Sequence, residues 1–229
     1  MADFAYETRW FADAVVKHDA VLRASALPNG HVSVERKSLS SITVAPLATP
    51  CIDTAVVESV LASCVPTVIL LIPPTSHYDW SARELAEENG STIHTVKELY
   101  TFMREPDPRR FVDKSVRYLW NLLETHSRVT SIEMICEALM LVKRREPLSD
   151  VIAAIEYEYE FSEAALVRAL KHHPGARVII NANPNGGATD AALTHAESAE
   201  VAILGVSEAM GALNLDGVRF REYVCRERR

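Results

Sequence analysis

Hydrophobic and polar positions in the first hundred residues alternate between helical and strand-like spacing. Apolar side chains over residues 4–18 recur at helical intervals, and three stretches that alternate with period two follow, joined by turns such as Pro28-Asn29-Gly30. A further helix, a fully apolar strand and another helix-strand-helix series come next. The pattern predicts the order α-β-β-β-α-β-α-β-α over residues 4–18, 21–27, 31–37, 42–47, 55–63, 67–72, 81–88, 91–96 and 97–103.

The rest of the chain shows similar segments after a stretch with a different pattern. Glu105-Pro106-Asp107-Pro108 predicts a linker, and residues 109–146 have apolar faces that favour helix. Residues 150–161 fit either a helical face or the alternation of a half-buried strand. The elements expected beyond them are a helix over 162–172, a strand over 177–181, a helix over 189–199, a strand over 201–204 and a helix over 207–213.

One motif occurs twice in the sequence. Residues 68–74 align without a gap with residues 178–184, and the match continues through the helix and strand that follow each of them. Repeats of this kind indicate repeated supersecondary units. The same register makes residues 150–161 the counterpart of the strand at 42–47, which favours the strand interpretation.

The element order and the repeat together suggest an organisation. We expect an α/β fold with a mixed central sheet flanked by helices. One unit covers residues 1–105, and residues 109–229 hold a helical segment followed by a partial second copy, with the two parts packing as one globule or a pseudo-dimer. The α-β-β-β-α-β order resembles the restriction-endonuclease-like (PD-(D/E)xK) superfamily over residues 4–103 and part of 150–214.

The resemblance implies a place for a metal site. In active members an acidic residue ends the second strand and an acid-x-Lys triplet lies on the third, so that carboxylates hold a divalent cation and the lysine assists the attacking water. Here Glu35 and Lys37 end the second strand, but the third strand, residues 42–47, has neither an acid nor a lysine. In the second copy, Glu156 and Glu158 lie on one face of the corresponding strand.

This incomplete motif implies a non-catalytic, degenerate nuclease fold. We expect a binding, regulatory or scaffold subunit of a nucleic-acid-related assembly. The alternative is a phosphodiesterase that uses Mg²⁺ or Mn²⁺ with Glu35, Lys37, Glu156 and Glu158. In the competing interpretation, Glu35 and Lys37 belong to a solvated strand end, and Glu156 and Glu158 lie on the solvated face of an edge strand or of a helix.

A loop rich in asparagine and glycine offers a different site. Asn181, Asn183 and Asn185 follow a predicted strand, and Asp190 opens the next helix. Backbone N–H groups before a helix can receive an anion, which favours a nucleotide or small-molecule site. The loop lacks a phosphate-binding motif, and the same residues are typical of ordinary turns.

The equivalent loop in the first copy contains His77 and Asp79. These two side chains can pair, although no nucleophile in a matching motif accompanies them. The other interpretation is a surface loop in which Asp79 caps the next helix. The four cysteines have no metal-binding spacing, which indicates indifferent thiols in a reducing compartment.

Two basic clusters stand out against an acidic composition. The first consists of Arg109, Arg110, Lys114 and Arg117, and the second consists of Lys143, Arg144 and Arg145. They are candidate contacts to nucleic acid. The net charge of −7 favours instead pairing with acidic neighbours on solvated faces.

The remaining features concern location and partners. The N-terminus has no basic and apolar signal segment, and the longest apolar run, residues 65–74, is too short to cross a bilayer. We therefore expect a soluble cytoplasmic protein with no membrane contact. We expect a protein partner or self-association. No cofactor is indicated with certainty.

Overall fold

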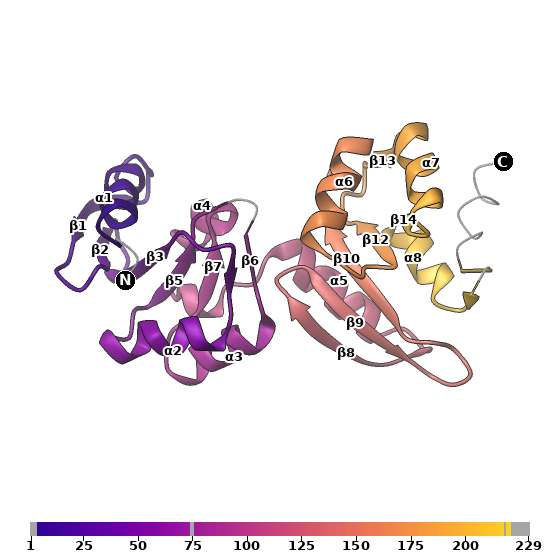
Figure 1. Ribbon diagram of the computed structural model, residues 1–229, viewed down its shortest axis with the longest axis horizontal. Coiled ribbons are helices and arrows are strands. Elements are labelled where there is room, and N and C mark those ends of the chain that lie inside the picture. The colour runs from indigo at the N-terminus through magenta and orange to yellow at the C-terminus, as the bar shows by residue number, and fades with distance from the viewer. Residues whose placement is uncertain (1–3, 74–75, 218, 221–229) are drawn as a thin grey trace. The chain divides into compact units, whose positions relative to one another are not determined.

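The computed structural model divides the chain into two α/β units, Met1–Phe111 and Val112–Arg229 (Figure 1). It describes residues 4–73, 76–217 and 219–220. Each unit has a five-stranded mixed sheet, which confirms the predicted α/β class. Within the described ranges, no helix is long and apolar enough to cross a bilayer.

The first unit follows the predicted order closely. Its elements are α1 (Phe4–Val15), β1 (Val21–Ala26), β2 (Val32–Arg36), β3 (Ile42–Leu47), β4 (Cys51–Ile52), α2 (Thr54–Ser63), β5 (Val68–Leu71), β6 (His77–Tyr78), α3 (Trp80–Glu88), β7 (Ile93–Thr95), η1 (Val96–Glu98), α4 (Leu99–Phe102) and η2 (Pro108–Arg110). The sheet order is β1-β2-β3-β5-β7, antiparallel across the first three strands and parallel across the last three. Strands β4 and β6 form a separate parallel pair.

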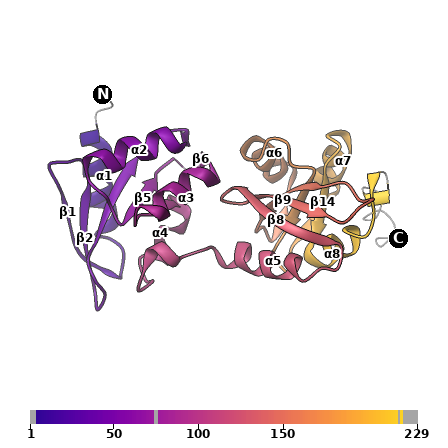
Figure 2. The same ribbon diagram turned by 90° about the horizontal axis from the view of Figure 1, so that it is seen from below.

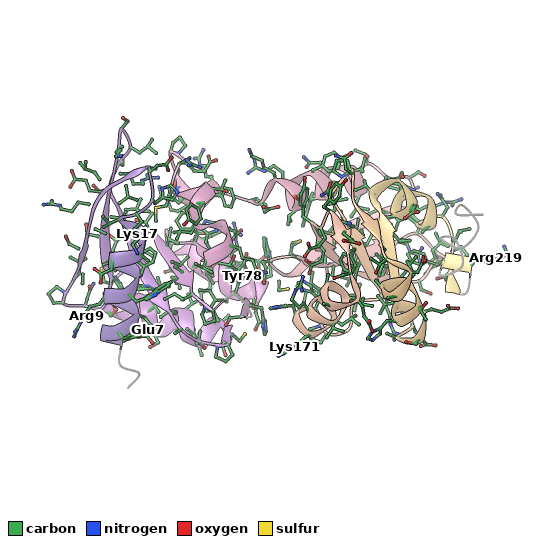
Figure 3. All side chains as sticks on the ribbon, turned by 90° about the horizontal axis from the view of Figure 1, so that it is seen from above. Glu7, Arg9, Lys17, Tyr78, Lys171 and Arg219 are labelled. Carbon is green, nitrogen blue, oxygen red and sulfur yellow. The ribbon has the colours of Figure 1, made fainter. Side chains whose placement is uncertain are left out.

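Helices cover both faces of this sheet (Figure 2). On one face, Phe11 and Val15 of α1 pack with Phe102 of α4 against β2, β3 and β5. On the other face, Val57 of α2 and Ala82 of α3 pack against β5 and β7. Apolar side chains fill the space between these layers (Figure 3), so the β5 strand is buried on both sides, as its continuous apolar run predicts.

The second unit contains the same kinds of element in the same order. They are α5 (Lys114–Glu124), β8 (Val129–Cys136), β9 (Leu139–Arg144), β10 (Val151–Glu156), β11 (Glu160–Phe161), α6 (Glu163–His172), β12 (Val178–Asn181), β13 (Gly187–Ala188), α7 (Asp190–Ser198), β14 (Ala202–Gly205) and α8 (Val206–Ala212). The sheet order is β8-β9-β10-β12-β14. Its first three strands are antiparallel, its last three are parallel, and β11 pairs with β13 in parallel.

The predicted helix over residues 109–146 is wrong beyond Glu124, because β8 and β9 form an antiparallel hairpin there. Met134 and Cys136 are buried in β8, while Ile135 between them is exposed. That alternation has the period of a strand. Because the run is rich in Leu, Met and Glu, which favour helices, the sequence pattern conceals it.

The predicted strand over residues 150–161 is interrupted. It forms β10 up to Glu156 and resumes as the short β11 at Glu160. Strand β10 pairs with β9 and β12 in the main sheet, whereas β11 pairs with β13 outside it. Glu156 and Glu158 therefore do not share one face of a continuous strand.

The predicted linker belongs to the first unit. Phe111 lies in the core formed with α1, and the buried Arg36 side chain binds the segment before it. Arg36 Nε donates to the Ser40 carbonyl at 2.8 Å, and Nη1 donates to the Glu105 carbonyl at 2.6 Å. Its Nη2 donates to the Pro106 carbonyl at 3.2 Å, so this Arg36 clamp fastens the end of the unit to its hairpin.

A second clamp occupies the same place in the other unit. Arg144 ends β9 as Arg36 ends β2, and its Nε donates to the Ser149 carbonyl at 2.6 Å. Its Nη1 donates to the Leu215 carbonyl at 2.6 Å and its Nη2 to Asp216 Oδ1 at 3.2 Å. This Arg144 clamp closes the second unit on the segment after α8.

Candidate functional site

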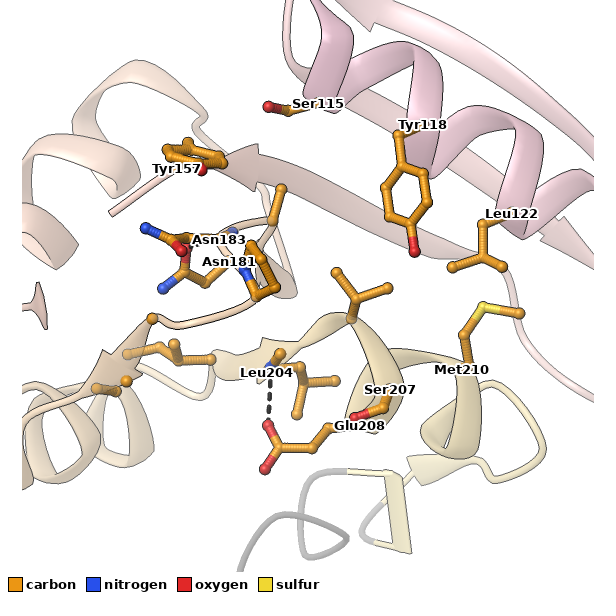
Figure 4. Close-up of a pocket in the computed structure, with 18 of the residues that line it drawn as sticks. Ser115, Tyr118, Leu122, Tyr157, Asn181, Asn183, Leu204, Ser207, Glu208 and Met210 are labelled. Atoms are coloured by element: carbon orange, nitrogen blue, oxygen red, sulfur yellow. Dashed lines mark hydrogen bonds between the residues drawn. The ribbon is translucent and has the colours of Figure 1, made fainter. Parts of the chain in front are cut away.

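A cavity of about 830 Å³ lies in the second unit, at the carboxyl ends of its parallel strands (Figure 4). Its walls come from α5, from Tyr157 after β10, from the loop between β12 and β13, and from the start of α8. The volume falls within the roughly 300–1,000 Å³ typical of small-molecule sites. In open α/β sheets, ligands bind outside the carboxyl ends of the strands, and this cavity lies at that position.

The Asn181 side chain builds one wall of the cavity. Its Oδ1 accepts from the backbone N–H of Glu158 at 3.1 Å, and its Nδ2 donates to the Glu158 carbonyl at 2.9 Å. A Cβ on Gly186 would lie 2.4 Å from both Asn181 Nδ2 and the Glu158 carbonyl oxygen. Close approach therefore requires glycine here, and the amide of Asn181 holds two loops together instead of facing a ligand.

Most N–H groups of the Asn181–Asp190 loop are engaged inside the protein. The N–H of Asn183 donates to Asn181 Oδ1 at 3.2 Å, and that of Asn185 donates to Asn183 Oδ1 at 3.0 Å. Those of Gly186 and Gly187 donate to backbone carbonyls. The loop therefore forms structural turns, which the sequence also allowed, and most of its N–H groups are already used within the protein.

The helix N-termini beside the cavity are also occupied. Thr189 Oγ1 caps α7 by accepting from Ala192, and Asp190 adds a negative charge in the first turn of that helix. The Glu208 carboxylate accepts from the N–H of Gly205 at 2.7 Å, as the dashed line in Figure 4 shows. Both arrangements disfavour an anionic ligand.

The remaining walls are mainly aromatic and apolar, and their polar members are Lys114, Ser115, Ser207 and Glu208. Tyr118 projects from α5 and Tyr157 from the loop after β10, and their side chains are 55% and 60% exposed. Leu122, Val206 and Met210 line the deeper wall. Large exposed tyrosines beside an apolar pocket supply stacking surface and hydroxyl groups, which suits an uncharged ligand with a flat ring.

The predicted catalytic carboxylates have separate partners. Glu35 lies 3.3 Å from Arg23 on the neighbouring strand, and Lys37 is exposed just beyond β2. Glu156 lies 3.5 Å from His173, and Glu158 lies 3.1 Å from Arg168 of α6. Among the described residues, none of these four belongs to a group within metal-binding reach.

Cys136, His173 and Glu156 form a row that resembles a nucleophile, base and acid. His173 Nδ1 lies 3.9 Å from Cys136 Sγ, and Nε2 on the other side of the ring lies 3.5 Å from Glu156 Oε1. Burial, with the Glu137 charge nearby, raises the pKa of the Cys136 thiol to about 12. A buried, protonated thiol is a poor nucleophile, and the ligand atoms of the row do not converge, so its role is packing.

The two predicted basic clusters are largely committed to partners. Arg109 binds both carboxylate oxygens of Asp107, at 2.8 and 3.1 Å, and Arg110 also lies near that carboxylate. Lys143 pairs with Glu133 on the facing strand.

The Arg144 side chain is 1% exposed, so nucleic acid cannot reach it, and that part of the prediction is wrong. Arg145 is exposed and remains a candidate.

The loop residues His77 and Asp79 lie close together, and a third residue, Cys51, which the sequence did not indicate, lies beside them. The two side chains come within metal-binding reach of Cys51, because β4 and β6 pair. Tyr118 and Tyr157 were also absent from the predicted binding residues. For Tyr157, the available signal was its position between two glutamates just after an apolar strand.

Comparisons with protein-family models, with curated proteins and with solved structures give no match for this chain.

Proposed function

We propose that this is a non-catalytic protein of nuclease-like fold that acts by binding, and that its second unit binds a small uncharged ligand with a flat ring, of the nucleoside or nucleobase class. The cavity beneath Tyr118 and Tyr157 carries this proposal. The committed loop N–H groups and the acidic residues at the helix N-termini argue against a phosphate group as the main anchor.

The architecture supports the nuclease-like part. Both units have the α-β-β-β-α-β order on which the resemblance rests, and the equivalent Arg36 and Arg144 clamps support an origin of the two units by duplication. The third strand of each unit, β3 or β10, lacks an acid-x-Lys triplet. A framework without those ligands is suited to binding.

The test is a ligand screen on the full chain by thermal shift and calorimetry, with nucleosides, nucleobases and their phosphorylated forms. We expect nucleosides or bases to bind, and Tyr118→Ala and Tyr157→Ala each to weaken binding roughly tenfold or more, since base–aromatic stacking is worth about 1–3 kcal/mol. Tyr159→Ala is the matched control, because Tyr159 is exposed nearby but does not line the cavity. Stronger binding of phosphorylated forms, or an equal loss with Tyr159→Ala, would overturn the assignment.

The catalytic alternative is tested separately. We expect no cleavage of DNA or RNA with Mg²⁺ or Mn²⁺, because the carboxylates that the motif requires are dispersed. Cleavage that Glu35→Ala or Glu156→Ala abolishes would establish the phosphodiesterase instead.

A further inference from the structure

Cys51, His77 and Asp79 form a cluster of potential metal ligands in the first unit. One ligand atom from each, the thiol sulfur, a ring nitrogen and a carboxylate oxygen, lies within 4.8 Å of the other two. We propose that these three residues bind Zn²⁺. The site lies in the other unit from the cavity and is independent of the ligand proposed there.

Backbone pairing holds the three residues in place. Cys51 of β4 lies opposite His77 of β6 in the parallel pair. The N–H of His77 donates to the Pro50 carbonyl at 3.2 Å, and that of Asp79 donates to the Ile52 carbonyl at 3.0 Å. Ligands fixed by strand pairing lose little conformational freedom when a metal binds.

The Asp79 side chain points to a role other than helix capping. Asp79 is the N-cap residue of α3, yet its carboxylate accepts no capping hydrogen bond. By contrast, Asp53 caps α2 by accepting from Val56 at 2.9 Å, and Thr189 caps α7 from the position equivalent to Asp79. Within the described residues, no hydrogen bond or ion pair engages the Asp79 carboxylate or the His77 ring. An unused cap costs helix stability, so a ligand near the thiol and imidazole explains the orientation of Asp79.

The donor set selects the metal. Thiolate and imidazole favour Zn²⁺, whereas Mg²⁺ and Ca²⁺ prefer oxygen ligands throughout. Three protein ligands leave the fourth tetrahedral position of Zn²⁺ to water or a further ligand. Cys51 and His77 are partly exposed and Asp79 is exposed, so the ion can enter from solvent.

The second unit provides an internal control. The positions equivalent to the three ligands are Glu160, Gly187 and Thr189, which lack the thiol and the imidazole. Among the described residues, the group around Cys51 is the one set of three or more histidine, cysteine and acidic side chains within metal-binding reach. Binding is therefore expected at one site per chain.

The test is titration of the full chain with Zn²⁺ by calorimetry and with Co²⁺ by absorption spectroscopy. We expect one ion per chain and, with Co²⁺, a thiolate charge-transfer band that Cys51→Ala removes. Loss of any ligand should weaken Zn²⁺ binding at least 100-fold, because even outer-shell partners are worth about 10–100-fold. His77→Ala and Asp79→Asn test the other two ligands.

Cys64→Ala is the matched control, since Cys64 is an exposed thiol outside the cluster. Circular dichroism of each metal-free variant establishes that it folds. Absence of stoichiometric Zn²⁺ binding to the folded wild type, or an unchanged affinity in folded Cys51→Ala, would overturn the proposal.

Discussion

The two units have the same strand order but differ at the ends of their parallel strands. In the first unit the short strand β6 carries His77 and Tyr78, and Tyr78 accepts a hydrogen bond from the buried Arg83. In the second unit the equivalent strand β13 is Gly187–Ala188, and both residues line the cavity. The two units thus share a strand order but differ at this edge of the sheet. The first unit has a cluster of metal-ligating groups there, and the second has a roomy cavity lined mainly by apolar and aromatic side chains.

The difference extends to the end of the last strand. His94 in β7 is buried, stacks on Phe102 with ring centroids 4.8 Å apart, and lies 3.5 Å from Glu98. The equivalent strand β14 ends in Leu204 and Gly205 beside the cavity. The first unit therefore buries a histidine ring where the second has Leu204, while both units have a glutamate, Glu98 or Glu208, at the start of the next helix.

The largest loss of stability should follow from removing either of the two arginine clamps, which both units have in common. Arg36→Ala is expected to destabilise the first unit by about 3 kcal/mol, because it removes the donor of the buried Met103 carbonyl and three part-buried hydrogen bonds, each worth about 1 kcal/mol. Arg144→Ala should cost a similar amount in the second unit, because it likewise removes the donor of one buried carbonyl, that of Leu213, together with part-buried hydrogen bonds. Hydrogen exchange read separately over the two units measures both effects.

The neighbouring exposed residues provide controls for the clamps. Lys37→Ala and Arg145→Ala remove a charge without a buried partner and should change stability by less than about 0.5 kcal/mol. Equal losses for Arg36→Ala and Lys37→Ala would contradict the role assigned to the Arg36 clamp.

A medium effect is expected in the loop that distinguishes the second unit. Gly186→Ala should destabilise that unit by about 1–3 kcal/mol, because its Cβ would overlap Asn181 and the Glu158 carbonyl. Gly187→Ala is the control, since a Cβ there meets no atom within 4 Å. Urea unfolding of both variants checks this, and equal stabilities would show that the loop relaxes freely.

The buried Glu98 of the first unit should make the stability of that unit depend on pH. Burial raises the pKa of Glu98, but its contacts with His94 and the Thr95 N–H outweigh burial and hold that pKa below its ordinary value of 4.5. A lowered pKa in the folded state contributes stability above the ordinary value, and this stability is lost as the pH falls through the lowered pKa.

Acidification below pH 4.5 should therefore weaken the first unit through Glu98, and Glu98→Gln should reduce that dependence. Hydrogen exchange of the first unit as a function of pH is the measurement. An unchanged pH profile in Glu98→Gln would rule out this carboxylate as the source.

The last prediction concerns the reactivity of two thiols and involves no change in stability. At neutral pH the Cys136 thiol should resist alkylation in the folded protein because burial raises its pKa to about 12, whereas exposed Cys64 should react readily. Mass spectrometry after a short pulse of iodoacetamide separates the two sites. Rapid labelling of Cys136 would show that the second unit opens locally.

Much of the first unit could be predicted from the sequence because its signals are local. The apolar run before Pro73, the turn at Pro28-Asn29-Gly30 and the cap at Asp53 each determine structure within a few residues. The β8–β9 hairpin was missed because its residues favour helices and only pairing across the hairpin reveals the strand period.

The sites were harder to predict because they depend on contacts between distant residues. Cys51 meets His77 through pairing of two short strands that the sequence pattern does not indicate. In the sequence, Arg144 lies between two other basic residues, which suggests an exposed cluster. In the fold it is buried, because the carbonyls of residues 213 and 215, far away along the chain, accept its hydrogen bonds. Asn181 and Asn183 line the cavity, but their side-chain amides form hydrogen bonds within the protein, so ligand binding by them stays a prediction.

The Arg36 clamp has a consequence for synthesis of the protein. Its partners at Glu105 and Pro106 leave the ribosome long after the β1–β2 hairpin, so the guanidinium obtains its full set of acceptors only when nearly all of the first unit has been translated. Because domains generally fold as units in the order of synthesis, we expect the first half of the nascent chain to close before the β8–β9 hairpin emerges. The two similar sheets should then complete their hydrogen bonding at different times, which would limit mispairing of strands between them.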